Sequence, residues 1–344
     1  MSSQYKVTVV IPFFNSEAFI HRCVDSVINQ SLKEIQVICI DDGSNDRSAD
    51  IVRSLSTNDN RILLLSQTNG GAGKARNLAL EHIEGEYVLF LDSDDYLSSQ
   101  ALLSAYSLAS ERDSEIVVMK SLVFEDGKEE KKWPQNNCIR YDLLPKKETF
   151  QLKEINKDIF SSFIWWPWDK LIKTELIQKK SLYFQETRTT NDLLFVFSAM
   201  YLASSISITK EFLVYHRISS NSLSVTREKS WTNFIQALLA VKDFLSRERV
   251  YNVREQDFLN YVMSFTVWQF CSLPFKSMVK VKYLYLPLIN IFFGLCHKPQ
   301  SYYYNQDKLE IFSIISGERT SPIFICKTFL KNKNNIKKLL KVFK

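Results

Sequence analysis

Several patterns that would place a protein in a familiar class are missing from this 344-residue sequence. Its six cysteines are scattered, and no two are spaced like a metal-binding or redox motif, which favours a reducing, cytoplasmic compartment. No hydrophobic region of signal-peptide type precedes the first expected strand. The apolar run from Tyr283 to Cys296 is short and contains Pro287, so it predicts a core or interfacial segment instead of a membrane-spanning helix.

Two common nucleotide-binding motifs are also missing. No Gly-x-x-x-x-Gly-Lys-Ser/Thr segment occurs, which argues against a P-loop. The turn Gly70-Gly71-Ala72-Gly73 follows the third expected strand, whereas the dinucleotide-binding fingerprint follows the first. A nucleotidyltransferase would need a basic, glycine-rich triphosphate loop near the first strand, and Phe13-Phe14-Asn15 is not one.

The net charge of +6 is carried by the end of the chain. Residues 331–344 contain six lysines and no acid, and without them 38 basic residues balance 38 acidic ones. This distribution does not suit a uniformly basic nucleic-acid-binding protein. Because Ile336, Leu339, Leu340 and Phe343 share one helical face, the tail suits either attachment to an anionic membrane at its inner face or packing on the protein itself.

Short apolar runs alternate with amphipathic segments along the first part of the chain. The runs predict strands over 7–11, 35–40, 62–65 and 87–91, and 114–123 suggests another. Helical spacing predicts helices over 17–30, with Ser16 as its cap, over 46–56 and over 74–82. This alternation predicts an α/β fold with a mostly parallel, doubly wound sheet, and from Trp231 onward the spacing becomes helical.

Three carboxylates, Asp92, Asp94 and Asp95, directly follow the strand expected at 87–91. Ionised carboxylates are too costly to bury unpaired, so we expect them at the rim of the sheet, in water or on a cation. Oxygen ligands at this density suit Mg²⁺ or Mn²⁺, especially beside substrate phosphates. We favour this interpretation for Asp92 and Asp94, whereas Asp95 is better explained as the cap of a helix that begins near Ser98.

Taken in order and spacing, four segments resemble the glycosyltransferases of family 2. They are Val9 to Asn15, Asp41 to Ser44, Asn69 to Asn77 and Asp92 to Asp94. The resemblance covers about residues 5–225 and implies an inverting, nucleotide-sugar-dependent enzyme of the GT-A fold, a Rossmann-like sheet flanked by helices. It implies a GT-A domain over 1–225, with a nucleotide-binding half (about 1–112) and an acceptor half (about 113–225), followed by a helical C-terminal region over 226–344.

The resemblance implies a role for each matching residue of the nucleotide-binding half. Binding of the nucleotide sugar is implied for Pro12, Phe14, Asn15, Glu17, Asp41, Asp42, Asn69, Arg76, Asp92 and Ser93. Asp94 matches the metal-binding acid, where Mn²⁺ or Mg²⁺ would stabilise the charge that develops on the leaving diphosphate. The alternative for some of these residues is a turn without a binding role. Pro12, Asn15 and Asp42-Gly43 are turn signals in any protein.

In the acceptor half, Asp192 aligns with the general base that takes the proton of the acceptor hydroxyl. Asn191 replaces the glutamate that the family usually places beside this base, and the loss of a like charge would tend to lower the pKa of Asp192. The alternative for Asp192 is an acid that only stabilises the first turn of a helix. Two roles are equally open for the next group, acceptor binding, which the resemblance implies, and packing in the core. The group consists of Trp168, Asp169 and Lys170.

The closing strand and loop of the family are matched by Tyr215, Arg217 and Ser222. The resemblance implies that Arg217 reaches the diphosphate. His216 is either a further metal ligand or a structural histidine, since a neutral imidazole can serve in both ways.

These observations predict a cytoplasmic inverting glycosyltransferase, peripheral at the membrane through its tail. It would move a hexose or N-acetylhexosamine from a UDP-sugar to a glycan, glycolipid or glycoprotein of the bacterial cell surface. No nucleic-acid partner is expected, and a homo-oligomer stays open. A non-catalytic nucleotide-sugar-binding partner of another transferase is the alternative, against which Asp94 and Asp192 argue.

Overall fold

The computed structural model describes residues 4–135, 138–218 and 230–317. Ser222 and the lysine-rich tail, to which the sequence analysis gave roles, lie outside the described residues. The chain divides into two compact units, of which the first comprises Met1–Ile139, Leu144–Ile155 and Ile164–Ser222. The second comprises Arg140–Leu143, Asn156–Phe163 and Leu223–Lys344. The main division therefore lies close to the boundary expected near residue 225.

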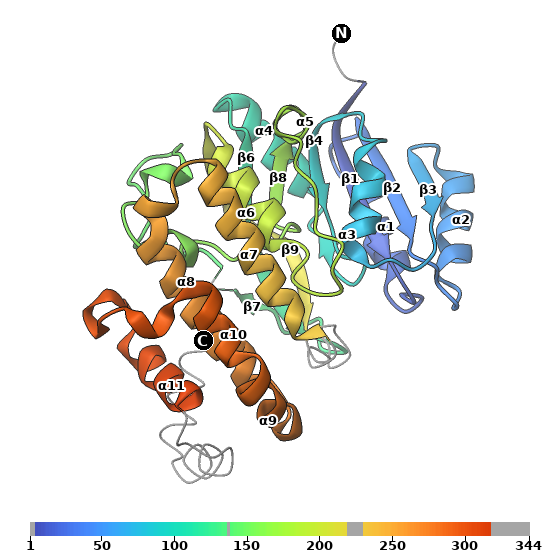
Figure 1. Cartoon of the computed structure of the whole chain (residues 1–344). Coiled ribbons are helices and arrows are strands. Elements are labelled where there is room, and N and C mark those ends of the chain that lie inside the picture. The colour runs from blue at the N-terminus through green and yellow to red at the C-terminus, as the bar shows by residue number, and fades with distance from the viewer. Residues whose placement is uncertain (1–3, 136–137, 219–229, 318–344) are drawn as a thin grey trace. The chain divides into compact units, whose positions relative to one another are not determined.

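Four parallel strands form the first half of the sheet in the order β3-β2-β1-β4 (Figure 1). Their bounds are Tyr5–Phe13 for β1, Ile35–Asp41 for β2, Ile62–Ser66 for β3 and Gly85–Phe90 for β4. Val9 of the central strand lies opposite Val37 on one side and Leu89 on the other. The order confirms the expected doubly wound sheet, because each crossover places a helix between neighbouring parallel strands.

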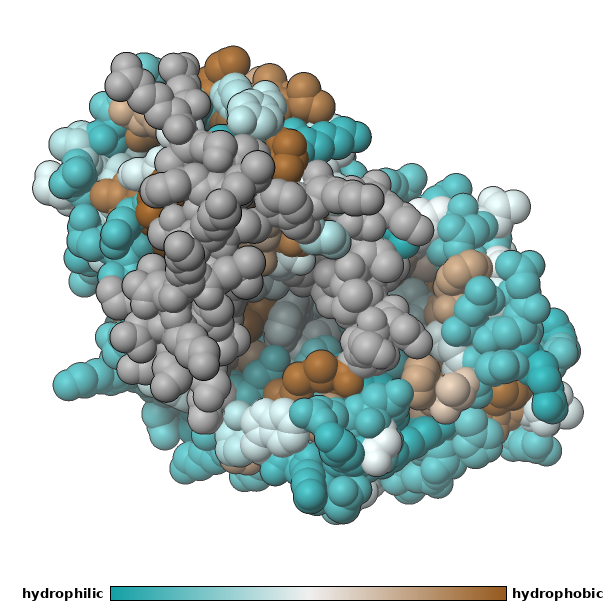
Figure 2. Space-filling model, turned by 90° about the horizontal axis from the view of Figure 1, so that it is seen from below, coloured by the Kyte–Doolittle hydropathy of each residue, from teal (hydrophilic) through white to brown (hydrophobic). Residues whose placement is uncertain are grey.

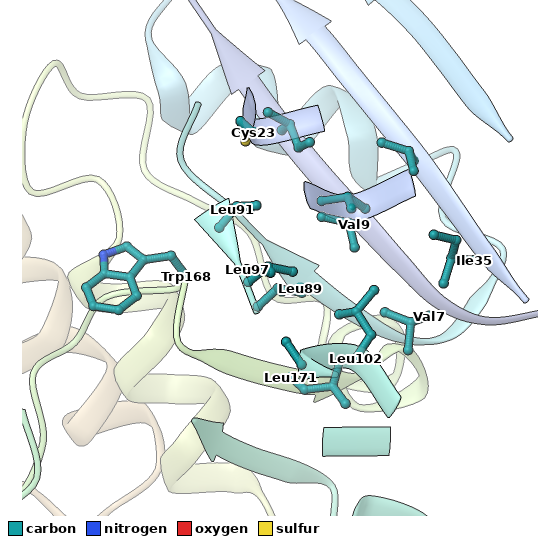
Figure 3. Packing of buried hydrophobic residues seen from close by; sticks show 14 of the residues in the cluster. Val7, Val9, Cys23, Ile35, Leu89, Leu91, Leu97, Leu102, Trp168 and Leu171 are labelled. Atoms are coloured by element: carbon teal, nitrogen blue, oxygen red, sulfur yellow. The ribbon is translucent and has the colours of Figure 1, made fainter. Parts of the chain in front are cut away.

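Four helices accompany these strands. They are α1 (Ile20–Ile28), α2 (Ser48–Asn58), α3 (Ala72–Leu80) and α4 (Ala101–Glu111). Val7, Val9 and Leu89 form a buried cluster with Leu102 of α4 and Cys23 of α1 (Figure 3). Strands buried in this way need no polar alternation, which explains the uniformly apolar runs of the sequence.

The start of α1 differs from the expectation. The helix begins at Ile20 instead of Glu17, and its N-cap position is Phe19, without a side-chain cap. Ser16 contributes its carbonyl oxygen, which accepts hydrogen bonds from the backbone of Phe19 and Ile20. The Ser16 hydroxyl lies instead 2.9 Å from that of Ser93, so it joins the two strand ends that carry the site.

The second half of the sheet is mixed. It contains β6 (Ile116–Glu125), β8 (Lys170–Lys173), β9 (Ile206–Ile218) and the short strands β5 (Tyr96–Leu97) and β7 (Trp133–Pro134). Strand β8 runs antiparallel between β4 and β6, and β9 runs parallel to β6. Helices α5 (Thr174–Lys180) and α6 (Leu193–Leu202) complete this half.

The helix cap expected at Asp95 is wrong. Asp95 is followed by β5, which pairs antiparallel with β9, and α4 begins only at Ala101, after Gln100. The sequence after the acids is too short to show a strand by periodicity, and its partner lies more than a hundred residues further along the chain.

The second unit is helical, as expected. Its long elements are α7 (Thr232–Arg247), α8 (Tyr251–Cys271), α9 (Phe275–Leu284), α10 (Leu286–Phe293) and α11 (Gln306–Ser316). The periodic residues of α7, Phe234, Leu238, Val241 and Leu245, are all buried. Among the described residues, no helix has both the length and the apolar character needed to cross a membrane.

Two neighbouring leucines of α4 test the packing of the first unit. Leu102 is fully buried, whereas Leu103 is 37% exposed. We expect Leu102→Ala to lower the free energy of unfolding of this unit by about 2–5 kcal/mol, because it leaves a cavity between α4 and the sheet. Leu103→Ala is the matched control and should cost about 1 kcal/mol or less. Urea unfolding of both variants measures the difference, and equal losses would contradict this packing.

Candidate active site

The site lies at the carboxyl ends of β1 and β4, where the strand order of the parallel sheet reverses. Such a switch point is where open α/β sheets bind ligands. Phe14 and Asn15 follow β1, and Phe14 is 44% exposed. Asn15 has a positive φ of 48°, and its side-chain oxygen accepts a hydrogen bond from the backbone of Asn45. Pro12 is buried within β1 and supports this turn without offering a polar group.

The loops after β1 and β2 hold each other in place. The Asp41 carboxylate accepts a hydrogen bond from the backbone of Ser44, whose hydroxyl accepts one from the backbone of Asn15. Glu17 accepts a hydrogen bond from the backbone of Arg47 at 3.1 Å. These residues of the expected nucleotide site therefore lie together at one sheet edge.

Asp42 organises the glycine-rich loop. Its buried carboxylate accepts hydrogen bonds from the backbone of Gly70 (2.7 Å) and Gly71 (2.8 Å) and from the side chain of Gln67. Asn69 donates to the Asp42 carbonyl oxygen. With its oxygens engaged in this way, Asp42 shapes the loop, and its expected contact with the nucleotide is at most indirect.

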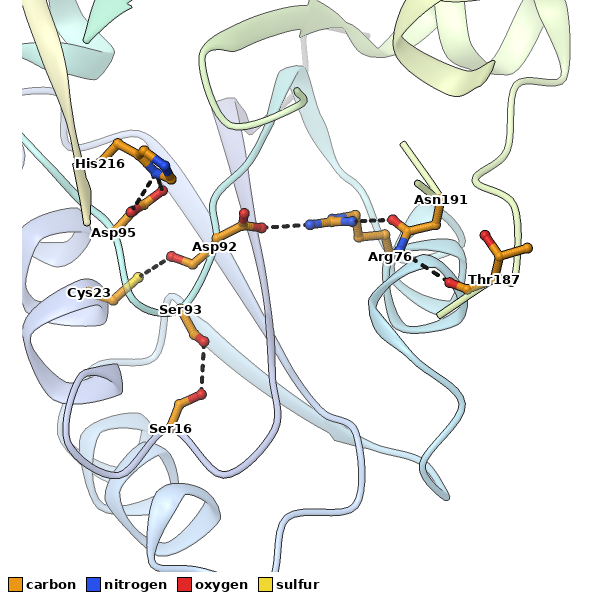
Figure 4. A network of polar contacts seen from close by, with 9 residues as sticks. All are labelled: Ser16, Cys23, Arg76, Asp92, Ser93, Asp95, Thr187, Asn191 and His216. Atoms are coloured by element: carbon orange, nitrogen blue, oxygen red, sulfur yellow. Dashed lines mark hydrogen bonds and ion pairs between the residues drawn. The ribbon is translucent and has the colours of Figure 1, made fainter. Parts of the chain in front are cut away.

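Arg76 links Asp92 to Asn191 (Figure 4). Its guanidinium forms an ion pair with Asp92 (2.6 Å) and donates a hydrogen bond to the Asn191 side chain (2.9 Å). Arg76 is only 4% exposed, and its Nε has no hydrogen-bond partner among the described residues. The residue that replaces the family's glutamate thus has a clear function here, because its amide oxygen accepts from Arg76.

Asp94 lies beside this bridge and is partly buried. Within the described part of the chain its carboxylate accepts no hydrogen bond, while its backbone oxygen accepts one from Arg217. Burial, with the charges of Asp95 and Asp92, raises the pKa of Asp94 to about 7. The charge of His216 opposes this rise only in part. A carboxylate in such an environment suits a divalent cation whose remaining ligands are phosphate oxygens and water. No group of three or more potential metal ligands occurs in the described ranges.

His216 pairs with Asp95 from the opposite strand. Its Nδ1 lies 3.0 Å from Oδ2 of Asp95, and the Arg217 backbone donates a hydrogen bond to Oδ1 of the same carboxylate. Burial disfavours a charged imidazole, but the carboxylates of Asp95, Asp94 and Asp92 outweigh it and raise the pKa of His216 to about 9. Trp168 stacks on the imidazole at 4.7 Å. This environment favours a protonated, structural histidine and does not support the metal-ligand alternative.

Arg217 is engaged in a network of its own. It is buried, and its guanidinium forms ion pairs with Asp126 (2.6 Å) and Glu129 (3.1 Å) of the turn after β6. The expected contact with the diphosphate would require Arg217 to leave both acids. The sequence could not show this pairing, because the turn and the strand are about ninety residues apart.

The expected acceptor residues are mostly buried. Lys170 and Asp169 form a buried ion pair at 2.5 Å, and Lys170 also donates to the carbonyl oxygens of Ile164 and Trp166. Neither side chain has surface to offer an acceptor, so their burial does not fit the acceptor-binding role. Trp168 is buried as well, whereas Trp166, which stacks on it at 5.1 Å, keeps part of its surface exposed.

Asp192 occupies the N-cap position of α6 but makes no capping hydrogen bond with its side chain. The helix is anchored by Phe195, whose ring stacks on Phe184 at 3.8 Å. Burial raises the pKa of Asp192 to about 6, which Arg76 opposes and Asp92 reinforces. Burial therefore raises the pKa of Asp192 by more than the loss of a neighbouring glutamate is expected to lower it. A carboxylate that does not cap its helix is available for proton transfer.

Gly73 brings the glycine-rich loop against the segment that carries this acid. A Cβ at Gly73 would lie 2.1 Å from the Gln185 carbonyl oxygen and 3.1 Å from the Asn191 Cβ. Only glycine allows this approach, so the close packing of α3 and the Asn191 segment depends on Gly73.

Comparison with known proteins agrees with this architecture. A family model described as "Glycosyl transferase family 2" matches residues 8–174. This part of the chain belongs to the family. The match covers the four parallel strands and the acids of the switch point, and it ends just after β8.

Individual relatives of this family-2 chain share part of its length. It is 33% identical to the glycosyltransferase EpsJ of Bacillus subtilis over 220 residues, which are 63% of this chain and 62% of that protein. It is 30% identical to the poly(ribitol-phosphate) beta-glucosyltransferase of Bacillus spizizenii over 62% of this chain and 32% of that one. The chain thus spans less than two thirds of the length of either relative.

A solved structure supports the fold over a longer range. The crystal structure of TarS from Staphylococcus aureus in complex with UDP-GlcNAc superimposes with a TM-score of 0.56. It covers 90% of both chains at 21% identity. The family-2 chain therefore has the expected GT-A architecture with a helical C-terminal region.

The charge on His216 provides a test of this geometry. Its proton should be lost only as the pH rises through about 9, because Asp95 stabilises the imidazolium. In Asp95→Asn this charge is removed, and we expect the pKa of His216 to fall toward the ordinary value of about 6.5. NMR titration of the imidazole resonances measures both values, with His216→Gln for assignment. Titration near the ordinary value in the unmodified protein would contradict the pair.

Proposed function

We propose that this protein is an inverting glycosyltransferase that moves a sugar from a UDP-sugar to a glycan, glycolipid or glycoprotein acceptor. The observation that carries the proposal is the Arg76 bridge between Asp92 and Asn191. It joins the expected donor edge to the segment that holds the expected base. Family membership and the strand order support the same assignment.

The nucleotide would bind over the loops after β1, β2 and β3. Phe14 offers an exposed ring to the base, and Asp41 and Asn15 lie in the same turn network. The unpaired Nε of Arg76 offers a donor that an oxygen of the nucleotide sugar can satisfy. We therefore propose that about residues 1–112 bind the nucleotide and that about residues 113–225 bind the acceptor.

Asp94 would hold Mn²⁺ or Mg²⁺ together with the phosphates of the donor. A bound divalent cation would stabilise the negative charge that builds up on the diphosphate as the glycosidic bond breaks. The unpaired carboxylate of Asp94 and its raised pKa support this role. His216 and Asp95 lie beside it and hold its strand against β9.

Asp192 would act as the general base. Its carboxylate takes the proton of the acceptor hydroxyl while that oxygen bonds to the anomeric carbon. The bond from this carbon to the phosphate oxygen breaks on the opposite face, and the nucleoside diphosphate leaves with the electron pair. Arg76 and Asn191 position the segment, and the exposed part of Trp166 offers an aromatic face to the acceptor sugar.

The relatives indicate the kind of acceptor. One is named a poly(ribitol-phosphate) beta-glucosyltransferase, and TarS, 29% identical over 215 residues, a poly(ribitol-phosphate) beta-N-acetylglucosaminyltransferase. We infer a hexose or N-acetylhexosamine donor and a bacterial surface glycan as the acceptor. A cytoplasmic location, with peripheral attachment at the inner face of the membrane, would bring the enzyme to a lipid-linked acceptor.

A donor panel tests the proposal. Purified protein with Mn²⁺ or Mg²⁺ is offered UDP-, GDP- and dTDP-sugars, and free nucleotide is measured with and without EDTA. We expect metal-dependent release from a UDP-sugar, lost in Asp94→Ala because the leaving diphosphate is no longer stabilised. Asp50→Ala, at an exposed aspartate of α2, is the matched control and should retain activity. No nucleotide release from any donor, with UDP binding retained in calorimetry, would favour the non-catalytic nucleotide-sugar-binding partner. No release and no metal-assisted UDP binding would contradict the proposal.

The raised pKa of Asp192 predicts a pH dependence. The base works only when ionised, so kcat/KM should fall about tenfold per pH unit below about pH 6. Asp192→Asn keeps the shape but cannot accept the proton, and we expect a loss of about 10²–10⁴ in kcat with UDP binding retained. Steady-state kinetics across pH and UDP calorimetry measure both. Full activity of Asp192→Asn would exclude this base.

A further inference from the structure

An apolar stripe runs along the outside of α9 and α10 in the second unit. Exposed hydrophobic residues gather in patches on the face of the molecule that Figure 2 shows. In α9 and α10 the exposed apolar residues occur as adjacent pairs, and each pair follows the previous one by four residues. This spacing places them on one side of a helix. The stripe consists of Tyr283, Leu284, Pro287, Leu288, Ile291 and Phe292.

The opposite side of the same helices is already used for packing. Leu286, Ile289 and Phe293 are buried, and Phe293 contacts Phe258 of α8 in an edge-to-face arrangement at 5.9 Å. Helix α10 is therefore apolar on both sides, with Ile291 73% exposed. A helix that is hydrophobic all round is normally buried, so this outer side indicates a surface that is covered in use.

The charged residues of the segment that carries the stripe are of one sign in the sequence, although in the structure Lys298 pairs with Glu255 at 2.6 Å. Between Asp257 and Asp307 the sequence contains no acidic residue, whereas it contains four lysines, 276, 280, 282 and 298. Lys280 is exposed one turn before the stripe. The Lys282 ammonium donates to the carbonyl oxygens of Ile315 and Gly317 and so holds α9 against the end of α11. An apolar stripe within a purely basic stretch complements an anionic, partly apolar surface.

We propose that the stripe on α9 and α10 docks on the surface of an anionic phospholipid bilayer. The apolar side chains would enter the boundary between headgroups and acyl chains, while Lys280 contacts the lipid phosphates. The site is distinct from the lysine-rich tail, and its use in reaching a lipid-linked acceptor rests on the proposed function.

A second copy of the chain fits this surface less well. Two copies meeting through the stripe would bring like-charged lysines together. A stable protein interface also needs about 20–30 residues on each side, whereas the stripe offers six.

Vesicle flotation with the full chain tests the proposal. The vesicles are phosphatidylcholine alone, or phosphatidylcholine mixed with phosphatidylglycerol. We expect binding to the anionic vesicles, reduced in Leu284→Gln/Ile291→Gln by at least about tenfold because two apolar side chains no longer leave water. Val253→Gln is the matched control, since Val253 is 78% exposed on α8 and outside the stripe, and its binding should change less than about twofold.

Further measurements separate the alternatives. Both changed residues are exposed, so circular dichroism should show intact helices. Lys280→Gln should weaken binding to anionic vesicles only. Unchanged binding in Leu284→Gln/Ile291→Gln, or a loss that follows only the replacement of the tail lysines, would overturn the proposal. A dimer that light scattering detects in the unmodified protein and that Ile291→Gln abolishes would also overturn the proposal. Nucleotide release from a UDP-sugar without membranes should be equal in all variants, so a failure of the proposed activity is seen separately.

Discussion

The contact on which the site depends most is the buried bridge from Asp92 through Arg76 to Asn191. A cation that is only 4% exposed is stable there because a carboxylate and an amide oxygen replace its water. Removing Asp92 would leave the buried Arg76 guanidinium without a counter-charge, because Asn191 offers only a neutral amide oxygen. The bridge also sets a distance, since it ties the end of β4 to the segment before α6, and Gly73 permits the close approach that this requires.

A second set of contacts closes the other side of the acidic cluster. Asp95 accepts from the Arg217 backbone and pairs with His216, while β5 pairs with β9. Asp94 is thereby held between two constrained neighbours with its own carboxylate unpaired. Arg76 and His216 balance the charges of Asp92 and Asp95, and the three carboxylates together support the proposal that Asp94 holds a cation.

Much of the first half could be predicted from the residue pattern. Strands β1, β2 and β4 are buried on both faces over most of their length, so their apolar runs are continuous and the acids that follow must lie at the rim. The side chains of Asp169, Lys170 and Arg217 were harder to assign. Each looks available in the sequence, yet Asp169 and Lys170 pair with each other in the interior, and Arg217 pairs with Asp126 of a distant turn. Their burial and the Arg217 pairing depend on how distant segments meet.

The sequence by itself determined the alternation of strands and helices in the first half, the edge at which the acids gather and the helical character of the second unit. Local periodicity and the cost of burying charge are sufficient for these features. Only the tertiary structure decided that Asp95 pairs with His216, that Asn191 accepts from Arg76, and that α10 exposes an apolar side. The physical reason is that hydrogen-bond partners and exposure are set by contacts between residues far apart in the chain, which no local pattern specifies.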